Sequence, residues 1–219
     1  MSELGAGLIA GITLRTLAVC LPALAVALLI GLPLGIALGR RRRFRARGAL
    51  VSLVNAGMGA PPVVVGLAGA LLMWRNGPLG AFGLMYTPGA MVLAQIAIAL
   101  PFVVGITLAS VGALDEDWEL QVRTLGVPPR WRWWLLLREI RLGLFAAVIA
   151  ALGGILSEVG AVMMVGGNLE GETRVLTTAI LMFTQMGEYE IALGLAAVLL
   201  GLTLLLAGLL TAVQQGGRA

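Results

Sequence analysis

The stretch that decides the fold class is residues 12–38, ITLRTLAVCLPALAVALLIGLPLGIAL, which is followed directly by GRRRRFRAR at residues 39–47. At about 1.5 Å rise per residue, the first run is long enough to cross the hydrocarbon core of a bilayer, about 30 Å thick, as a helix. It is also too long, and too densely followed by arginine, for a cleaved signal peptide. The two runs together predict a transmembrane helix that stays in the chain.

The basic run sets the direction of this helix. Its arginines are Arg40, Arg41, Arg42, Arg43, Arg45 and Arg47. Loops rich in Lys and Arg that adjoin a membrane span stay on the cytoplasmic side. A nucleic-acid-binding tail would have a similar composition, but a position between two apolar runs favours a cytoplasmic loop.

Further apolar runs recur along the chain, at residues 49–74, 89–111, 142–165 and 191–213. Hydrophobic residues make up 59% of the sequence and the mean hydropathy is +0.99, whereas roughly 45–50% of the residues of soluble domains are apolar. We therefore predict an all-α integral membrane protein, in which residues 1–219 form a single domain with five transmembrane helices.

A second arginine-rich segment, residues 115–141, fixes the topology. Its arginines are Arg123, Arg130, Arg132, Arg138 and Arg141. The positive-inside rule places this segment in the cytoplasm together with the first cluster. Alternation of the spans then puts the N-terminus outside and the C-terminus in the cytoplasm.

The apolar run at residues 175–186 is ambiguous, because it is shorter than the roughly 17 residues that a crossing helix needs. We predict a re-entrant or interfacial segment on the outer side of the membrane. The alternative is a sixth crossing, which would place the C-terminus outside.

The composition excludes several kinds of site. Cys20 is the only cysteine, and the chain has neither histidine nor lysine. It therefore lacks a disulfide framework, the commonest zinc ligand and the lysine of a phosphate-binding loop. We expect no metal or cofactor, and any ATP hydrolysis must come from a partner. A membrane enzyme is disfavoured, because no G-x-S-x-G nucleophile motif is present either.

The cytoplasmic segment predicts a short amphipathic helix. Asp115, Glu116 and Asp117 favour the positive end of a helix dipole, and Gly126 followed by two prolines ends the helix. An apolar stripe, spaced i, i+4 and i+7, is formed by Trp118, Val122 and Leu125. A second amphipathic piece follows, with Trp131, Trp133 and Trp134 placed for headgroup depth. A partner that moves such a segment moves both adjoining spans; the alternative is an ordinary interfacial loop.

Residues 115–141 resemble the cytoplasmic signature loop of ABC importer permeases, which begins Glu-Ala-Ala, has a glycine at fixed spacing and ends Ile-x-Leu-Pro. The matching stretch is LQVRTLG at residues 120–126, with Glu119 one place before the expected glutamate, and LLRE at residues 136–139 stands at the ending. The resemblance implies that an ATPase couples through Glu119, Gln121, Arg123, Thr124, Leu125 and Gly126.

Other segments resemble the tungstate-type branch of these permeases: MGAPPVVVGL at residues 58–67, LSEVGAVMMVGGN at 156–168 and ETRVLTTAI at 172–180. The resemblance begins at GLPLG, residues 31–35, and extends to the last span. It implies a type-1 ABC importer permease in the inner membrane. Such a permease forms a homodimer with two cytoplasmic ATPase subunits, and an extracytoplasmic binding protein delivers an oxyanion. Tungstate is the substrate that the resemblance favours; molybdate, sulfate and phosphate stay open.

Residues that break or polarise a span are candidates for the translocation pathway. Pro61 and Pro62, among glycines, break their span and free backbone groups to line a cavity, or they only permit close helix contact. Glu158 is an ionisable group within a span, where burial is costly. It acts in gating, or it forms a structural hydrogen bond. The candidates are Pro61, Pro62, Gln95, Ser157, Glu158 and Asn168.

The outer loop holds Glu170 and Arg174 at i, i+4 spacing, which suits either a solvated ion pair or a docking contact for the binding protein. A transporter working alone is the main competing function. It is disfavoured by the amphipathic cytoplasmic segment and by an odd number of spans without an inverted repeat.

Overall fold

The computed structural model describes residues 3–41, 45–115 and 117–216. Arg42, Arg43 and Glu116 of the predicted segments lie outside the described residues. Within these ranges all regular structure is helical, as predicted. The elements are α1 (Glu3–Arg40), α2 (Arg47–Met58), α3 (Pro62–Met73), the 3-10 turn η1 (Gly80–Phe82), α4 (Pro88–Gly112), α5 (Trp118–Thr124), α6 (Pro129–Glu139), α7 (Arg141–Leu156), α8 (Gly160–Gly166), α9 (Leu176–Gln185) and α10 (Tyr189–Gly216).

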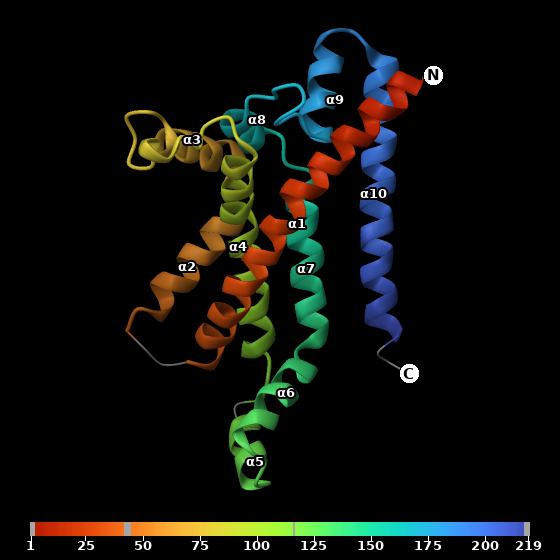
Figure 1. The fold of residues 1–219 in the computed structure, drawn as a ribbon. Helices are drawn as coiled ribbons and strands as arrows, with labels where there is room; N and C mark the ends of the chain where they lie inside the picture. Colours follow the sequence, from red (N-terminus) through yellow and green to blue (C-terminus); the bar gives the residue numbers. More distant parts are fainter. Residues whose placement is uncertain (1–2, 42–44, 116, 217–219) are drawn as a thin grey trace.

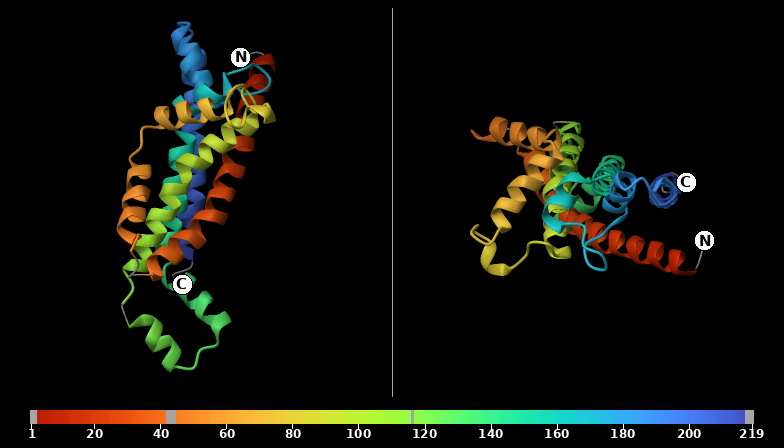
Figure 2. Two further views of the ribbon diagram at one scale, coloured as in Figure 1. Left: turned by 90° about the vertical axis from the view of Figure 1, so that its left-hand side faces the viewer. Right: turned by 90° about the horizontal axis from the view of Figure 1, so that it is seen from above.

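Three described helices, α1, α4 and α10, are each long and apolar enough to cross a membrane, and two bent helix pairs raise the number to as many as five. The predicted all-α membrane fold is confirmed at this level. In Figure 1 α4 and α10 run along the long axis of the molecule, and α1 crosses it obliquely. The segment with α5 and α6 projects from one end of the bundle (Figure 2).

The run at residues 49–74 is broken, as its two prolines predict. The axes of α2 and α3 differ by 102°. Pro61 is extended, with φ −60° and ψ 124°, and Pro62 opens α3. Proline has no N–H to donate and disfavours helical geometry in the residue before it, so the α2 hydrogen-bond ladder cannot continue. As a result α3 lies across the bundle at the end opposite α5 (Figure 1).

The prediction of one continuous helix over residues 142–165 is wrong. The helix α7 ends at Leu156, and α8 begins at Gly160. The physical reason lies in Glu158, whose carboxylate accepts a hydrogen bond from the N–H of Ala161 at 2.7 Å. This bond satisfies a backbone donor at the start of α8 and stabilises a new helix start within the apolar run.

The helix α9 covers most of the ambiguous run. Its 10 residues span only about 15 Å, which is half the hydrocarbon thickness. It lies at the same end of the molecule as the N-terminus (Figure 1). The Thr16 hydroxyl of α1 accepts a hydrogen bond from the N–H of Leu176 at 3.0 Å, so the start of α9 is attached to α1.

Small residues bring α1 and α4 together. Gly31, Gly35 and Gly39 recur every four residues on one face of α1, and a Cβ at each would lie within 2.8 Å of Val103, Thr107 or Val111. Small residues at this spacing allow helix backbones to approach closely in membranes. The contact fixes the last turns of α1 against α4, and it thereby positions Arg40.

Candidate functional site

The segment of α5 and α6 rests on the ends of the long helices. Ile36 of α1, Val111 of α4, and Leu136 and Ile140 after α5 form a buried apolar cluster, against which Trp118 of α5 packs. Burial of such a cluster holds the short helices against the bundle. The cluster thus joins α5 and α6 to the ends of α1 and α4.

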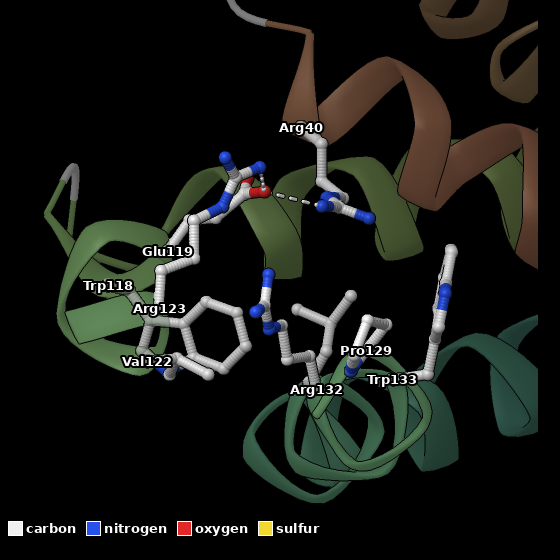
Figure 3. A pocket seen from close by; sticks show the side chains of 9 residues that line it. Arg40, Trp118, Glu119, Val122, Arg123, Pro129, Arg132 and Trp133 are labelled. Carbon is white, nitrogen blue, oxygen red and sulfur yellow. Dashed lines mark hydrogen bonds and ion pairs between the residues drawn. The ribbon is translucent and has the colours of Figure 1, made fainter. Parts of the chain in front are cut away.

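Glu119 lies at the centre of this junction (Figure 3). Its Oε1 accepts hydrogen bonds from Nη2 of Arg123 at 2.6 Å and from Nη2 of Arg40 at 2.8 Å. The hydrogen bond from Arg123, together with that from Arg40, holds the pKa of Glu119 below its ordinary value. Glu119 is therefore ionised at neutral pH and joins α5 to the end of α1.

Arg40 makes a second contact from the same position. Its guanidinium lies 5.3 Å from the ring centroid of Trp133 on α6, within the range of a cation–π interaction. These side chains line a small cavity between α1, α5 and α6 (Figure 3). From the sequence, Arg40 is only one arginine of the basic cluster. Its contact with Glu119 could not be predicted, because the two residues are 79 positions apart and nothing local links them.

The end of α5 confirms the predicted role of Gly126 as a helix terminator. Gly126 has φ +71°, its N–H donates to the carbonyl of Arg123 at 3.0 Å, and the N–H of Val127 donates to that of Val122 at 3.4 Å. This pair of bonds is a Schellman motif, which requires a left-handed residue. The space around Gly126 is open, so backbone conformation is the reason for glycine here.

The predicted apolar stripe of α5 is wrong at one position. Val122 is buried, but Leu125 is 78% exposed, because it is the capping residue beyond the last helical turn and no longer follows the helical spacing. Leu120 is also exposed, at 63%. Gln121 and Thr124 are exposed as well. Leu120 and Leu125 are therefore exposed apolar side chains on α5 and at its end.

A separate cavity, of about 250 Å³, lies at the break between α2 and α3 and at the break between α7 and α8. It is lined by the turn between α2 and α3, by the α7 end and by α4. The predicted pathway candidates Pro61, Pro62, Ser157 and Glu158 all belong to its lining. The structure thus brings together residues from two distant parts of the sequence at one cavity.

Glu158 has hydrogen-bond partners of its own within the described residues. Its side chain, 5% exposed, accepts from the Ala161 N–H, and its backbone carbonyl accepts from the Thr177 hydroxyl at 2.8 Å. The Ser157 hydroxyl donates to the Gly153 carbonyl instead. This geometry matches the structural alternative, a hydrogen bond to a backbone group. No local pattern in the sequence marks Thr177, which joins α9 to the cavity wall.

The remaining pathway candidates lie elsewhere. Gln95 is 2% exposed on α4, with its Nε2 3.6 Å from the sulfur of Cys20 on α1. Asn168 follows α8 in left-handed geometry, φ 54°, and its Nδ2 lies 3.3 Å from the sulfur of Met182. Neither residue lines the cavity, and both join neighbouring elements.

The loop between α8 and α9 forms its expected ion pair. Nη1 of Arg174 lies 3.3 Å from Oε2 of Glu170, and the side chain of Arg174 is only 12% exposed whereas that of Glu170 is 73% exposed. Because the Arg174 side chain is largely buried, the pair is held against the protein and is not freely solvated. A role in docking a binding protein stays a prediction.

Apolar helices of membrane-spanning length, spans interrupted at a cavity and an amphipathic segment at one end together define the class of multi-pass membrane permeases. The family model described as binding-protein-dependent transport system inner membrane component matches residues 31–218. The chain belongs to this family.

Several similar proteins align with most of the chain. It is 38% identical to a probable anion ABC transporter permease protein of Haloferax volcanii, over 93% of this chain and 90% of the relative. Identity to the tungstate uptake system permease protein TupB of Peptoclostridium acidaminophilum is 37%, over 88% and 84%. The TupB protein of Campylobacter jejuni is 35% identical, over 72% of this chain and 66% of the relative. The relatives are transport components, in agreement with a non-catalytic subunit.

Proposed function

We propose that this chain is the permease subunit of an ATP-binding-cassette importer and that it carries an oxyanion, with tungstate as its substrate. The observation that carries the proposal is the family match over residues 31–218 together with a segment, α5 and α6, attached to the ends of the long helices. The tungstate and anion permeases among the relatives support the choice of substrate. Molybdate, sulfate and phosphate are the competing oxyanions.

The ATPase subunit docks on α5 in this proposal. The exposed Leu120 and Leu125 offer the apolar contact, with Gln121, Arg123 and Thr124 around them. Movement of α5 then reaches α1 through the Glu119–Arg40 ion pair. Movement of α5 also reaches α4, which precedes α5 in the chain, and α7, which follows α6. ATP binding to the paired ATPases would move these helices together and open the pathway outward.

We further propose five crossings in the inner membrane, with the N-terminus outside and the C-terminus in the cytoplasm. The arginines of residues 40–47 and 123–141 support this direction by the positive-inside rule. A second copy of the chain completes the pathway as a homodimer. An extracytoplasmic binding protein docks at the opposite end, where α9 and the Glu170–Arg174 pair lie.

The cavity at the broken spans is the proposed pathway segment. Helix interruptions leave backbone N–H and C=O groups free to line a cavity. Backbone N–H groups and hydroxyls hold an oxyanion without a full countercharge. Glu158 lines this cavity, and its side chain accepts the hydrogen bond from the Ala161 N–H that holds the start of α8.

Uptake measured with the reconstituted complex tests the substrate. The permease, its ATPase and its binding protein are placed in vesicles, and ATP-dependent tungstate uptake is measured against competing molybdate, sulfate and phosphate. We expect ATP-dependent uptake of labelled tungstate. Unlabelled tungstate should suppress this uptake at a lower concentration than molybdate, sulfate or phosphate does. Transport of glycine betaine, an amino acid or a metal cation, without any oxyanion, would refute the substrate assignment.

A further inference from the structure

One face of α6 exposes an unusual set of large side chains. Trp131 is 50% exposed and Trp134 is 48% exposed, and their ring centroids lie 6.0 Å apart, whereas Leu136 and Ile140 on the opposite side are buried. Leu137 adds to the exposed side. Exposed apolar side chains gathered on one face mark an interaction surface.

Cations share this face with the tryptophans. At 3.6 residues per turn, Arg130, Trp134 and Arg138 fall in one line along α6, while Glu139 falls on the other side of the helix. The Arg138 guanidinium lies 5.2 Å from the Trp134 ring centroid. Among the described residues, neither Arg130 nor Arg138 forms an ion pair with a carboxylate. The face is therefore aromatic and cationic, with no acidic group to neutralise it.

The bend between α6 and α7 determines how far α6 extends from the membrane surface. The axes of α6 and α7 differ by 61°, and α6 has 11 residues. Its length of roughly 16 Å therefore descends only about 8 Å along the axis of α7, which is comparable to the thickness of the headgroup layer. A helix in this position lies at the surface of the bilayer that α7 enters.

We propose that the exposed face of α6 binds anionic phospholipid headgroups. Tryptophan rings favour the headgroup level of a bilayer, and guanidinium groups form paired, charge-assisted hydrogen bonds with phosphate oxygens. The competing occupant is the ATPase subunit, but the exposed leucines at 120 and 125 belong to α5 and not to this face. The inference goes beyond the proposed function, because it depends neither on the solute nor on the direction of transport.

Fluorescence quenching by brominated lipids tests the proposal on the full chain in vesicles. Trp74→Phe, Trp118→Phe and Trp133→Phe leave only Trp131 and Trp134, the tryptophans of this face, to emit. The vesicles are phosphatidylcholine with a minor fraction of phosphatidylglycerol, and in each experiment one of the two lipids is brominated near its carbonyl groups. We expect brominated phosphatidylglycerol to quench more strongly than brominated phosphatidylcholine at equal mole fraction.

Charge substitutions on α6 give the decisive comparison. Each arginine near an anionic surface contributes about 1 kcal/mol, or about fivefold in relative lipid binding. Replacing both Arg130 and Arg138 by Gln should abolish the preference for phosphatidylglycerol, whereas replacing both by Lys should retain most of it. The Lys variant separates loss of charge from misfolding. Arg75→Gln, an exposed position between α3 and η1 at the other end of the bundle, is the matched control and should change nothing.

Several outcomes would overturn the proposal. Equal quenching by the two lipids, or a preference that survives the double Gln substitution, would show that the face has no selectivity for anionic lipid. Tryptophans that neither lipid quenches, but that the added ATPase subunit shields from aqueous acrylamide, would assign the face to the ATPase. Because quenching is read without transport, either result leaves the proposed function to its own test.

Discussion

At the scale of single residues, Arg40 and Glu119 join the end of α1 to α5, 79 residues further along the chain, and Arg40 also contacts Trp133 of α6. Glu119 accepts hydrogen bonds from Arg123 and Arg40, which lower its pKa below the value of the unfolded chain. The stabilisation is therefore fully present above the unfolded pKa and is lost as the pH falls through the lower, folded pKa. Exposed ion pairs contribute about 0.2–1 kcal/mol each, so the effect is modest.

The lowered pKa of Glu119 predicts how the stability of the chain depends on pH. The wild-type chain should be more stable than Glu119→Gln by about 0.5–1 kcal/mol near pH 7. The difference should vanish at acidic pH, because protonated Glu119 no longer pairs with the arginines. Denaturation midpoints in detergent, measured for both chains across the pH range, check it. A difference that stays constant down to pH 3 would contradict the role assigned to the carboxylate.

Gly126 permits a matched pair of substitutions. Gly126→Ala should destabilise the end of α5 by about 1 kcal/mol, because a left-handed backbone with φ +71° disfavours a Cβ. Gly126→Asn should cost less, since asparagine tolerates this conformation better. Hydrogen exchange of residues 118–124 measures both effects. Equal exchange in the two variants would mean that crowding or another contact, and not the backbone angle, selects glycine.

Glu158 separates a capping role from a charge role. Glu158→Gln keeps an oxygen that accepts from the Ala161 N–H and should retain transport, whereas Glu158→Leu loses that bond, with a cost of about 1–3 kcal/mol for the unpaired buried donor. Uptake and thermal stability of the two variants are the measurements. Loss of uptake in a stably folded Gln variant would show that the negative charge itself is needed.

At the scale of elements, the contact between α3 and α8 holds the two broken spans together at the cavity. A Cβ at Gly66 would overlap the backbone of Ala161, whereas one at Gly69 would meet Met73 and Val165 at ordinary distances of 3.5 and 3.6 Å. Gly66→Ala should therefore destabilise the chain by about 1–3 kcal/mol through overpacking. Gly69→Ala, one turn along the same helix, is the control. Equal stability of the two variants in a thermal scan would contradict this packing.

The sequence predicted those elements whose cause is local. Residues 88–112 form one helix, even with Pro101 inside it, because an apolar run of that length without a charged residue satisfies its backbone groups in a bilayer as a helix. The break of α2 and α3 was equally local, since Pro61 and Pro62 cannot continue a helical ladder. The end of α5 followed from a glycine before prolines.

Elements with a tertiary cause were missed. The break between α7 and α8 contains no proline; it is held by Glu158 and by the hydroxyl of Thr177, 19 residues away. The attachment of Arg40 to Glu119 spans 79 residues. Four pathway candidates proved to share one cavity, but the sequence could not tell which of the six would do so, because the lining depends on how the broken spans pack.

At the scale of the whole molecule, α4 and α7 connect the two candidate sites. The exposed surface of α5 that is proposed to bind the ATPase follows α4 in the chain, and α6 leads directly into α7. Ile98 and Phe102 of α4 and Gly154 of α7 line the cavity at the broken spans. A rigid displacement at α5 therefore acts on helices that also form the cavity wall, and Arg40 extends this displacement to α1.

The dependence of solute flux on the ATPase tests this account most directly. Tungstate flux is measured in vesicles that contain the permease alone, and in vesicles that also contain the ATPase and the binding protein, each with and without ATP. The account predicts substantial flux only when all the subunits and ATP are present. Rapid flux through the permease alone, with no nucleotide or companion subunit, would contradict it.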